Sequence, residues 1–172
     1  MTSKLKTDVL ETVSGSGTIA LTNQLSGMTS ASVPSGSVIQ TVSNTFSTTG
    51  STTSSTLSAL GLSQSITPIS TSSKVYVLVT GSGARNGTDV GTVFTIYRGS
   101  TDLKTGSLGM VVTYQAGASN TAVCWSMQKL DSPSTASAIT YSVYWRTRDN
   151  GNLSQNNYLG GETTITLTEI KG

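Results

Sequence analysis

The sequence predicts an all-β protein, with an extended N-terminal segment followed by an antiparallel β-sandwich that has jelly-roll or Greek-key connections. Three observations indicate this fold class. Ser and Thr supply 59 of the 172 residues, and Thr suits the pleated, half-buried surface of a strand. Charged residues make up only 10%, against about 25% in typical soluble domains, so the helix formers Lys and Glu are scarce. Short strand-like runs alternate with clusters of turn residues, and no convincing helix is present.

Residues 1–33 form the first predicted part of the chain, and their apolar residues are too thinly spread to build a core. Val9, Leu10 and Val13 have helix-like spacing over one turn, but the Ser and Gly residues of 14–17 stop any helix there. We expect this segment to oligomerise with sister chains or to dock on another protein, and disorder is the alternative. The candidate docking residues are Leu5, Val9, Leu10 and Val13.

Residues 34–172 form the predicted sandwich, which begins after the turn signal at Pro34 and Gly36. Its first half contains a strand, an exposed Ser/Thr loop, a run whose end is limited by a proline, and a central strand, at Val38–Phe46, 47–56, Leu57–Ile69 and Lys74–Thr80. The last of these is apolar on both faces, so we expect the opposite sheet and a neighbouring subunit to cover it.

The second half of the sandwich continues in the same way after a predicted loop at 81–91. Further strands are expected at 92–98, 110–115, 121–129, 139–146 and 163–170. The five residues 116–120 read as a hairpin connection between the second and third of these strands. In the fourth, Ile139, Tyr141, Val143 and Trp145 fall on one face, the period of two that indicates a half-buried strand.

Residues suited to chemistry are scarce. The chain has no histidine, which removes the commonest general base and metal ligand. Cys124 is the only cysteine, so a disulfide within the chain is excluded, and its apolar surroundings predict a small buried hydrophobe. We therefore expect no catalytic residues, no metal site and no cofactor.

Two alternatives to that expectation stay open. The eight carboxylates could supply a glycosidase pair, but all except Glu169 fall in predicted turns, loops or the N-terminal segment. The turns at Asp102 and at 149–152 carry oxygen ligands that could hold a structural Ca²⁺, although neither has the spaced acidic series of a calcium loop.

Charge and hydropathy limit the partners. The formal net charge is +2 with no run of Lys or Arg, so no nucleic-acid partner is expected. The N-terminus lacks the apolar stretch of a signal peptide, and no segment approaches 18 consecutive apolar residues. We expect synthesis in the cytoplasm without membrane insertion.

Arg85, Asn86 and Tyr158 are candidate ligand-facing residues, because all three fall in predicted loops. An exposed aromatic ring beside amide and guanidinium groups could stack on a sugar and hydrogen-bond it. A tyrosine that merely packs a loop or an interface is the alternative.

Several short motifs resemble one family. They are the opening stretches 4–12, 15–19 and 25–29, and in the predicted sandwich the stretches 60–62, 66–68, 72–75, 96–100 and 163–170. In order and spacing they resemble fibre-like structural proteins of marine tailed bacteriophages, such as cyanophages. The resemblance implies a homotrimer whose N-terminal segment attaches to the virion, on the tail or the capsid, and whose sandwich forms the distal head.

The resemblance leads to one expected function and two alternatives. The expected function is a virion fibre or fibre tip that presents its head to a host surface glycan. A capsid decoration protein that stabilises the capsid lattice is the first alternative. A carbohydrate-binding module is the second.

Overall fold

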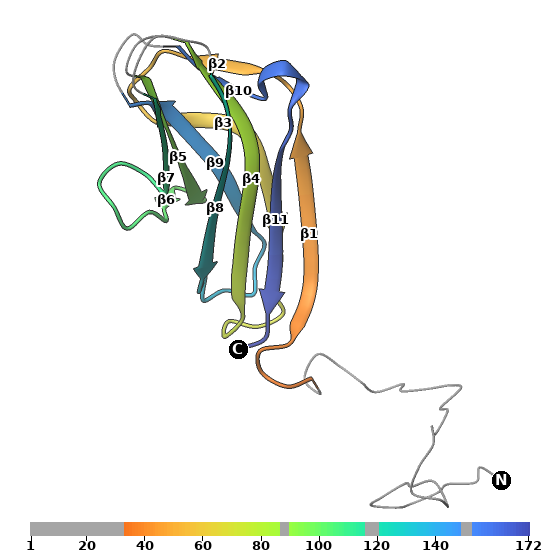
Figure 1. The fold of residues 1–172 in the computed structure, drawn as a ribbon. Helices are drawn as coiled ribbons and strands as arrows, with labels where there is room; N and C mark the ends of the chain where they lie inside the picture. Colours follow the sequence, from red (N-terminus) through yellow and green to blue (C-terminus); the bar gives the residue numbers. More distant parts are fainter. Residues whose placement is uncertain (1–32, 87–89, 116–120, 149–152) are drawn as a thin grey trace, which may run out of the picture. The chain divides into compact units, whose positions relative to one another are not determined.

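A computed structural model describes residues 33–86, 90–115, 121–148 and 153–172. Residues 34–172 form one compact unit, and residues 1–33 are assigned to a separate one. Within the described residues the secondary structure is almost entirely antiparallel β-strand, arranged as two sheets packed face to face (Figure 1). The predicted β-sandwich is therefore confirmed.

Sheet one lies nearest the reader in Figure 1, and its four long strands follow the order β1, β11, β4, β8. Their bounds are Val38–Phe46, Thr163–Ile170, Lys74–Asn86 and Thr121–Asp131. Strand β4 is central, because β8 pairs along one edge while β11 and then the short β10 (Leu153–Asn156) pair along the other. The three-residue β2 (Gly50–Thr52) pairs with β10.

Sheet two follows the order β3, β9, β5, with two shorter strands on the outer edge of β5. The bounds of β3, β9, β5, β6 and β7 are Ser58–Ile66, Ile139–Thr147, Val90–Arg98, Thr101–Asp102 and Val111–Gln115.

The strand order is that of a jelly roll. Apart from β2, β6 and β10, which have two to four residues, eight described strands remain. The first pairs with the last (β1 with β11), the second with the seventh (β3 with β9), the third with the sixth (β4 with β8) and the fourth with the fifth (β5 with β7). A long antiparallel ribbon rolled into two sheets produces this nesting.

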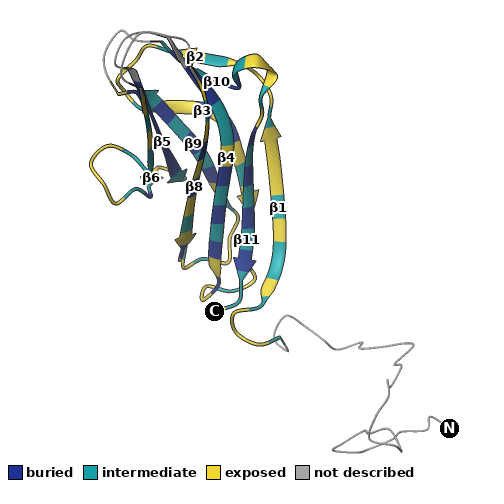
Figure 2. Cartoon of the chain, in the orientation of Figure 1, coloured by how far each residue is buried: buried dark blue, intermediate teal, exposed yellow. Residues whose placement is uncertain are grey.

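The core lies between the two sheets, and Figure 2 shows buried and less buried residues alternating along β4 and β11. In β4 the inward residues Val75, Val77 and Val79 are fully buried. Across the core, Phe94 stacks on Trp125 with ring centroids 4.0 Å apart. The predicted inward face of β9 is confirmed, since Tyr141, Val143 and Trp145 are all buried. Burial of this apolar face at about 25 cal/mol per Å² is the main stabilising term.

Within the chain the opposite sheet covers one face of strand β4, while Tyr76 and Leu78 on its outward face stay partly exposed. The expected cover of that outward face by a neighbouring subunit stays a prediction. Three other local expectations are corrected by the structure. The Ser/Thr loop 47–56 contains β2. The predicted hairpin across 116–120 is wrong, since β7 pairs with β5 in sheet two and β8 with β4 in sheet one. A rolled ribbon passes from sheet to sheet at this connection, whereas a hairpin would stay in one.

The third correction concerns Cys124, which is exposed instead of buried. Its neighbours Val123 and Trp125 share one side of β8, and Trp125 faces the core. The strand period of two therefore turns Cys124 outward.

The two ends of the sandwich differ. At one end, called the base, the entering and leaving chain are joined by hydrogen bonds from Gly36 N to Lys171 O (2.8 Å) and from Lys171 N to Ser37 O (2.9 Å). The other end, called the loop end, contains the end of β1, the end of β4 and the 3₁₀ turn η2 (Tyr158–Gly160) (Figure 1). In the described parts of the chain no helix has the length and apolar character needed to cross a membrane.

Candidate functional site

Asn157 holds the η2 turn against the loop end of sheet one. Its side-chain Nδ2 donates to Phe46 O (2.6 Å) and to Thr48 O (3.1 Å), and its backbone N–H donates to Ser82 O (3.0 Å). Its Oδ1 accepts a 2.8 Å hydrogen bond from the hydroxyl of Thr163. Asn157 is completely buried and adopts φ 53°, a left-handed conformation that Asn tolerates better than most residues. One residue thus fixes the position of the turn.

The turn presents Leu159 to solvent in a strained conformation. Leu159 has φ 58°, and its side chain is 83% exposed. The left-handed conformation destabilises a non-glycine residue by about 1–2 kcal/mol. The exposed Leu159 side chain buries too little apolar area to offset that cost. Tyr158, the neighbouring predicted ligand-facing residue, is half-buried. Leu159 is therefore a candidate contact residue.

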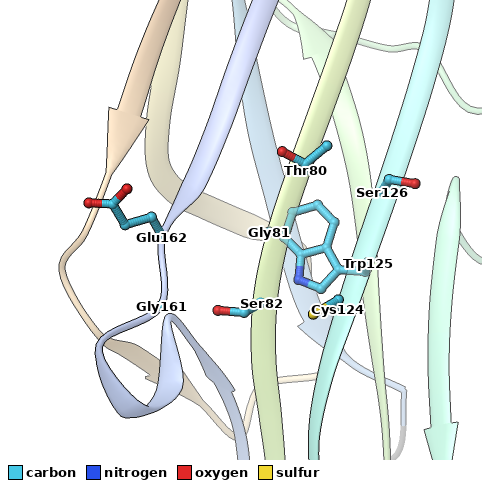
Figure 3. A pocket seen from close by; sticks show the side chains of 8 residues that line it. All are labelled: Thr80, Gly81, Ser82, Cys124, Trp125, Ser126, Gly161 and Glu162. Carbon is cyan, nitrogen blue, oxygen red and sulfur yellow. The ribbon is translucent and has the colours of Figure 1, made fainter.

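An open hollow of about 520 Å³ lies beside this turn on the outward side of sheet one (Figure 3). It is lined by hydroxyl and thiol groups of β4 and β8 and by the chain leading into β11, namely Thr80, Gly81, Ser82, Cys124, Trp125, Ser126, Gly161 and Glu162. Glu162 is the one carboxylate in this lining. The lining can hydrogen-bond a neutral polar ligand, and it does not bring a second carboxylate next to the first.

Two buried polar atoms of the lining have no hydrogen-bond partner among the protein atoms described: Ser82 Oγ and Trp125 Nε1. Ser82 Oγ lies beneath Gly161, where a Cβ would come within 1.9 Å of it. A Cβ on Gly81 would come 2.6 Å from the Trp125 ring, so Trp125 packs across the backbone of β4 on the core side. A side chain at Gly81 would displace the Trp125 ring, and one at Gly161 would displace Ser82 Oγ.

The outward face of sheet one is called the hydroxyl face. It consists of the outward residues of β1, β11, β4 and β8, mainly Thr41, Ser43, Thr45, Thr164, Thr166, Thr168, Lys74, Tyr76, Leu78, Thr80, Cys124, Ser126, Gln128 and Leu130. Threonines pair across the strands, with Oγ1 of Thr45 and Thr164 3.0 Å apart. The Tyr76 hydroxyl donates to the side chain of Gln128. Among the described residues of these four strands, Lys74 is the only charged side chain that points outward.

The predicted ligand-facing residues are not all in loops. Strand β4 runs as far as Asn86, so the expectation that Arg85 and Asn86 lie in a loop is wrong. Pairing with β8 and β10 overrides the turn-like composition of Gly81-Ser82-Gly83, because Arg85 lies opposite both Thr121 and Ser154. Tyr158 does lie in a turn, and Asn157 beside it bonds Ser82, three residues before Arg85 on β4.

Sequence reasoning missed Leu159 and Glu162. An apolar residue beside the Gly160-Gly161 pair was the available signal for Leu159. Nothing in the local sequence pointed to the hollow, because its lining comes from three separate strands or loops. The candidate docking residues Leu5, Val9, Leu10 and Val13 lie outside the described residues.

Of the two candidate calcium turns, the one at Asp102 lies within the described residues. Within the described ranges no group of three or more His, Cys, Asp or Glu side chains is placed to hold a metal ion. Asp102 binds protein groups, accepting hydrogen bonds from Thr95 Oγ1 (2.7 Å) and Lys104 N (3.1 Å) and pairing with Lys104 Nζ (3.1 Å). The turn at 149–152 lies outside the described residues.

Comparison with models of protein families and with curated proteins finds no match for this chain.

Proposed function

We propose that the chain is a structural protein of a tailed-bacteriophage virion: a homotrimeric fibre or fibre tip whose N-terminal segment docks on the particle. The β-sandwich is then the head that faces the host surface. Support comes from the resemblance of the sequence motifs, from the separation of the two ends of the sandwich and from the character of the hydroxyl face.

The separation of the ends suits a head at the tip of a particle. The chain enters the sandwich at Pro34, at the base, where Ser35 Oγ also bonds Gly172 O at 3.2 Å. Leu159 and the η2 turn lie at the loop end, which the full length of β1 separates from the base (Figure 1). A segment that anchors the chain through Pro34 is joined to the sandwich at the end opposite the loop end, and the loop end is the part proposed to contact a second surface.

The hydroxyl face is the observation that carries the proposal of self-association. In a threefold trimer the three copies of a face turned toward the symmetry axis lie close together, and like charges on them repel one another. The hydroxyl face has only Lys74 as a charged outward residue in its described part. Leu130, half exposed, and the partly exposed Tyr76 and Leu78 add apolar area to it. These properties favour contact with copies of the chain through this face.

The fold is compatible with this role by analogy alone. Jelly rolls occur in viral capsid proteins and in lectins, and a fold does not by itself imply a function.

The mass of the full-length protein in solution tests the proposal. We expect the natural protein to have the mass of three chains. The variant Thr166→Arg, which places a charge at the centre of the hydroxyl face, should have the mass of one chain. Ser63→Arg, on the exposed outward side of β3 in sheet two, is the matched control and should remain trimeric. A monomeric natural protein would contradict the proposal. A trimeric Thr166→Arg variant would show that the chains do not associate through the hydroxyl face.

Capsid decoration is the second candidate, because a neutral hydroxyl face could equally pack on a lattice of another protein. Imaging of particles separates the two candidates. Density for the sandwich on the capsid shell would favour decoration, and density at the tail would favour the fibre.

A further inference from the structure

The outward face of sheet two differs from the hydroxyl face, because arginine and tyrosine side chains follow one another along it from Tyr97, near the base, to Arg148, at the loop end. Along β9 and the residue after it, Tyr144, Arg146 and Arg148 point outward, alternating with the buried Val143, Trp145 and Thr147. Successive outward residues of a strand are about 7 Å apart. With Tyr97 of β5 and Tyr114 of β7 they form a surface that we call the Arg–Tyr face.

The aromatic rings of this face are held in place by contacts between strands. The Arg148 guanidinium lies over the Tyr114 ring, 4.8 Å from its centroid. To reach it, Arg148 crosses β5 at Gly91, where a Cβ would come 2.9 Å from the Arg148 Cβ. The Tyr97 and Tyr144 rings stack with centroids 4.0 Å apart. A tyrosine stack and a cation–π pair thus fix the side chains before any ligand arrives.

Neither Arg146 nor Arg148 forms an ion pair with another described residue. The described residues form two ion pairs, Arg98 with Asp131 and Lys104 with Asp102, and neither uses Arg146 or Arg148. Arg146 Nη1 donates to the backbone oxygen of Thr147 at 3.0 Å. Asp102 is the acidic residue on the outward side of sheet two within the described ranges, and Lys104 pairs with it. Asp89 and Asp149 lie outside the described residues.

From these observations we propose that the Arg–Tyr face binds an anionic polysaccharide, one whose sugars carry carboxylate or sulfate groups. The planar guanidinium forks of Arg146 and Arg148 would donate paired hydrogen bonds to those groups. The tyrosine rings would pack on the apolar faces of the sugars. This inference rests on the proposed function in one respect, because a host surface polymer is the expected source of such a ligand.

A glycan fits this face better than a nucleic acid. Affinity for nucleic acid comes largely from many Lys and Arg contacts with phosphates, whereas this face offers two arginines in a chain of net charge +2. Two weak contacts per head suit a polymer bound by several heads at once, since linking weak sites raises the overall affinity about 100- to 10,000-fold.

Titration calorimetry of the full-length protein with polygalacturonate, dextran sulfate, neutral dextran and single-stranded oligothymidylate tests the proposal. We expect binding to one or both anionic polysaccharides, none to neutral dextran and at least tenfold weaker binding to the oligonucleotide. The double variant Arg146→Gln/Arg148→Gln should weaken polysaccharide binding at least tenfold. Lys129→Gln/Lys171→Gln, which removes the same charge near the base, should change it less than twofold.

Three results would overturn the inference: binding to neither anionic polysaccharide, equal losses in the two double variants, or binding to the oligonucleotide as tight as to the polysaccharides. Thermal melting of both double variants checks that each is folded. The mass of each sample separates the two proposals, because a monomer that binds polysaccharide contradicts the trimeric fibre and leaves the Arg–Tyr face standing. A trimer that binds none contradicts the Arg–Tyr face alone.

Discussion

The hydroxyl of Tyr141 donates a 2.7 Å hydrogen bond to Oδ2 of Asp131, and both residues are buried. Arg98 Nη1 lies 2.9 Å from Oδ1 and 2.8 Å from Oδ2 of the same carboxylate. Asp131 ends β8 in sheet one, whereas Tyr141 and Arg98 belong to β9 and β5 in sheet two. This cluster joins the two sheets by polar contacts near the base.

Removing the Tyr141 hydroxyl should destabilise the sandwich. We expect Tyr141→Phe to lower the free energy of unfolding by about 1.5–3 kcal/mol, because a buried carboxylate loses a hydrogen bond and the ring stays in place. Urea denaturation measures the change. Tyr144→Phe, on the partly exposed Arg–Tyr face, is the matched control and should change it by less than about 0.5 kcal/mol. Equal effects of the two variants would contradict the role of the cluster.

The same tyrosine should make stability fall at alkaline pH. Burial, followed by the hydrogen bond to Asp131 and the charge of that carboxylate, raises the pKa of Tyr141 above its ordinary value of about 10. A raised folded-state pKa contributes stability that is complete below the unfolded pKa and is lost as pH rises above it. The natural protein should lose up to about 1.4 kcal/mol per pH unit more than Tyr141→Phe above pH about 10. Parallel pH profiles of the two would contradict this assignment.

Asn157 should matter for stability far more than an ordinary loop residue. Asn157→Ala removes the bonds to Phe46, Thr48 and Thr163 and places a residue less suited to φ 53°, so we expect a loss of about 2–4 kcal/mol. Asn157→Gly loses the same side chain and keeps the left-handed conformation, so it should cost about 1 kcal/mol less. Urea denaturation of both variants measures these values. If Gly proves as costly as Ala, backbone strain is not part of the penalty.

Substitution of Leu159 should weaken surface contact without lowering the stability of the protein. Leu159→Gly relieves the strain of φ 58° and removes an exposed side chain, so we expect stability to be unchanged or to rise by up to about 1 kcal/mol. If the η2 turn contacts the host surface, adsorption of particles carrying the variant should fall at least fivefold. Unchanged adsorption would remove the turn from the proposed contact surface.

The labelling rate of Cys124 should measure whether the hydroxyl face is covered by other copies of the chain. Cys124 is the only cysteine and is exposed in the single chain. We expect a maleimide reagent to label the natural trimer at least tenfold more slowly than the Thr166→Arg monomer, since packed copies would cover the thiol. The labelling rate is measured on native protein and normalised to the rate after denaturation. Equal native rates would show that the thiol is not covered.

The sequence by itself determined the fold class and the faces of individual strands. The alternation of Tyr141, Val143 and Trp145 with polar residues correctly predicted which side of β9 faces the core. The run Val38–Phe46 is a strand with the predicted bounds. Both follow from local physics, because the two-residue period of a strand and the conformations of turn residues act over a few neighbours.

The tertiary structure alone decided which strands meet. Gly81-Ser82-Gly83 has the composition of a turn, yet β4 continues through it because β8 and β10 supply hydrogen-bond partners on both edges and Trp125 covers the two glycines. The 116–120 connection joins different sheets because β7 and β8 each pair with a strand far away in the sequence. The hollow, the hydroxyl face and the Arg–Tyr face depend on the same long-range pairing. No short stretch of neighbouring residues specifies which distant strands pair. Local patterns therefore predicted the strands, but they could not predict the surfaces that several paired strands form together.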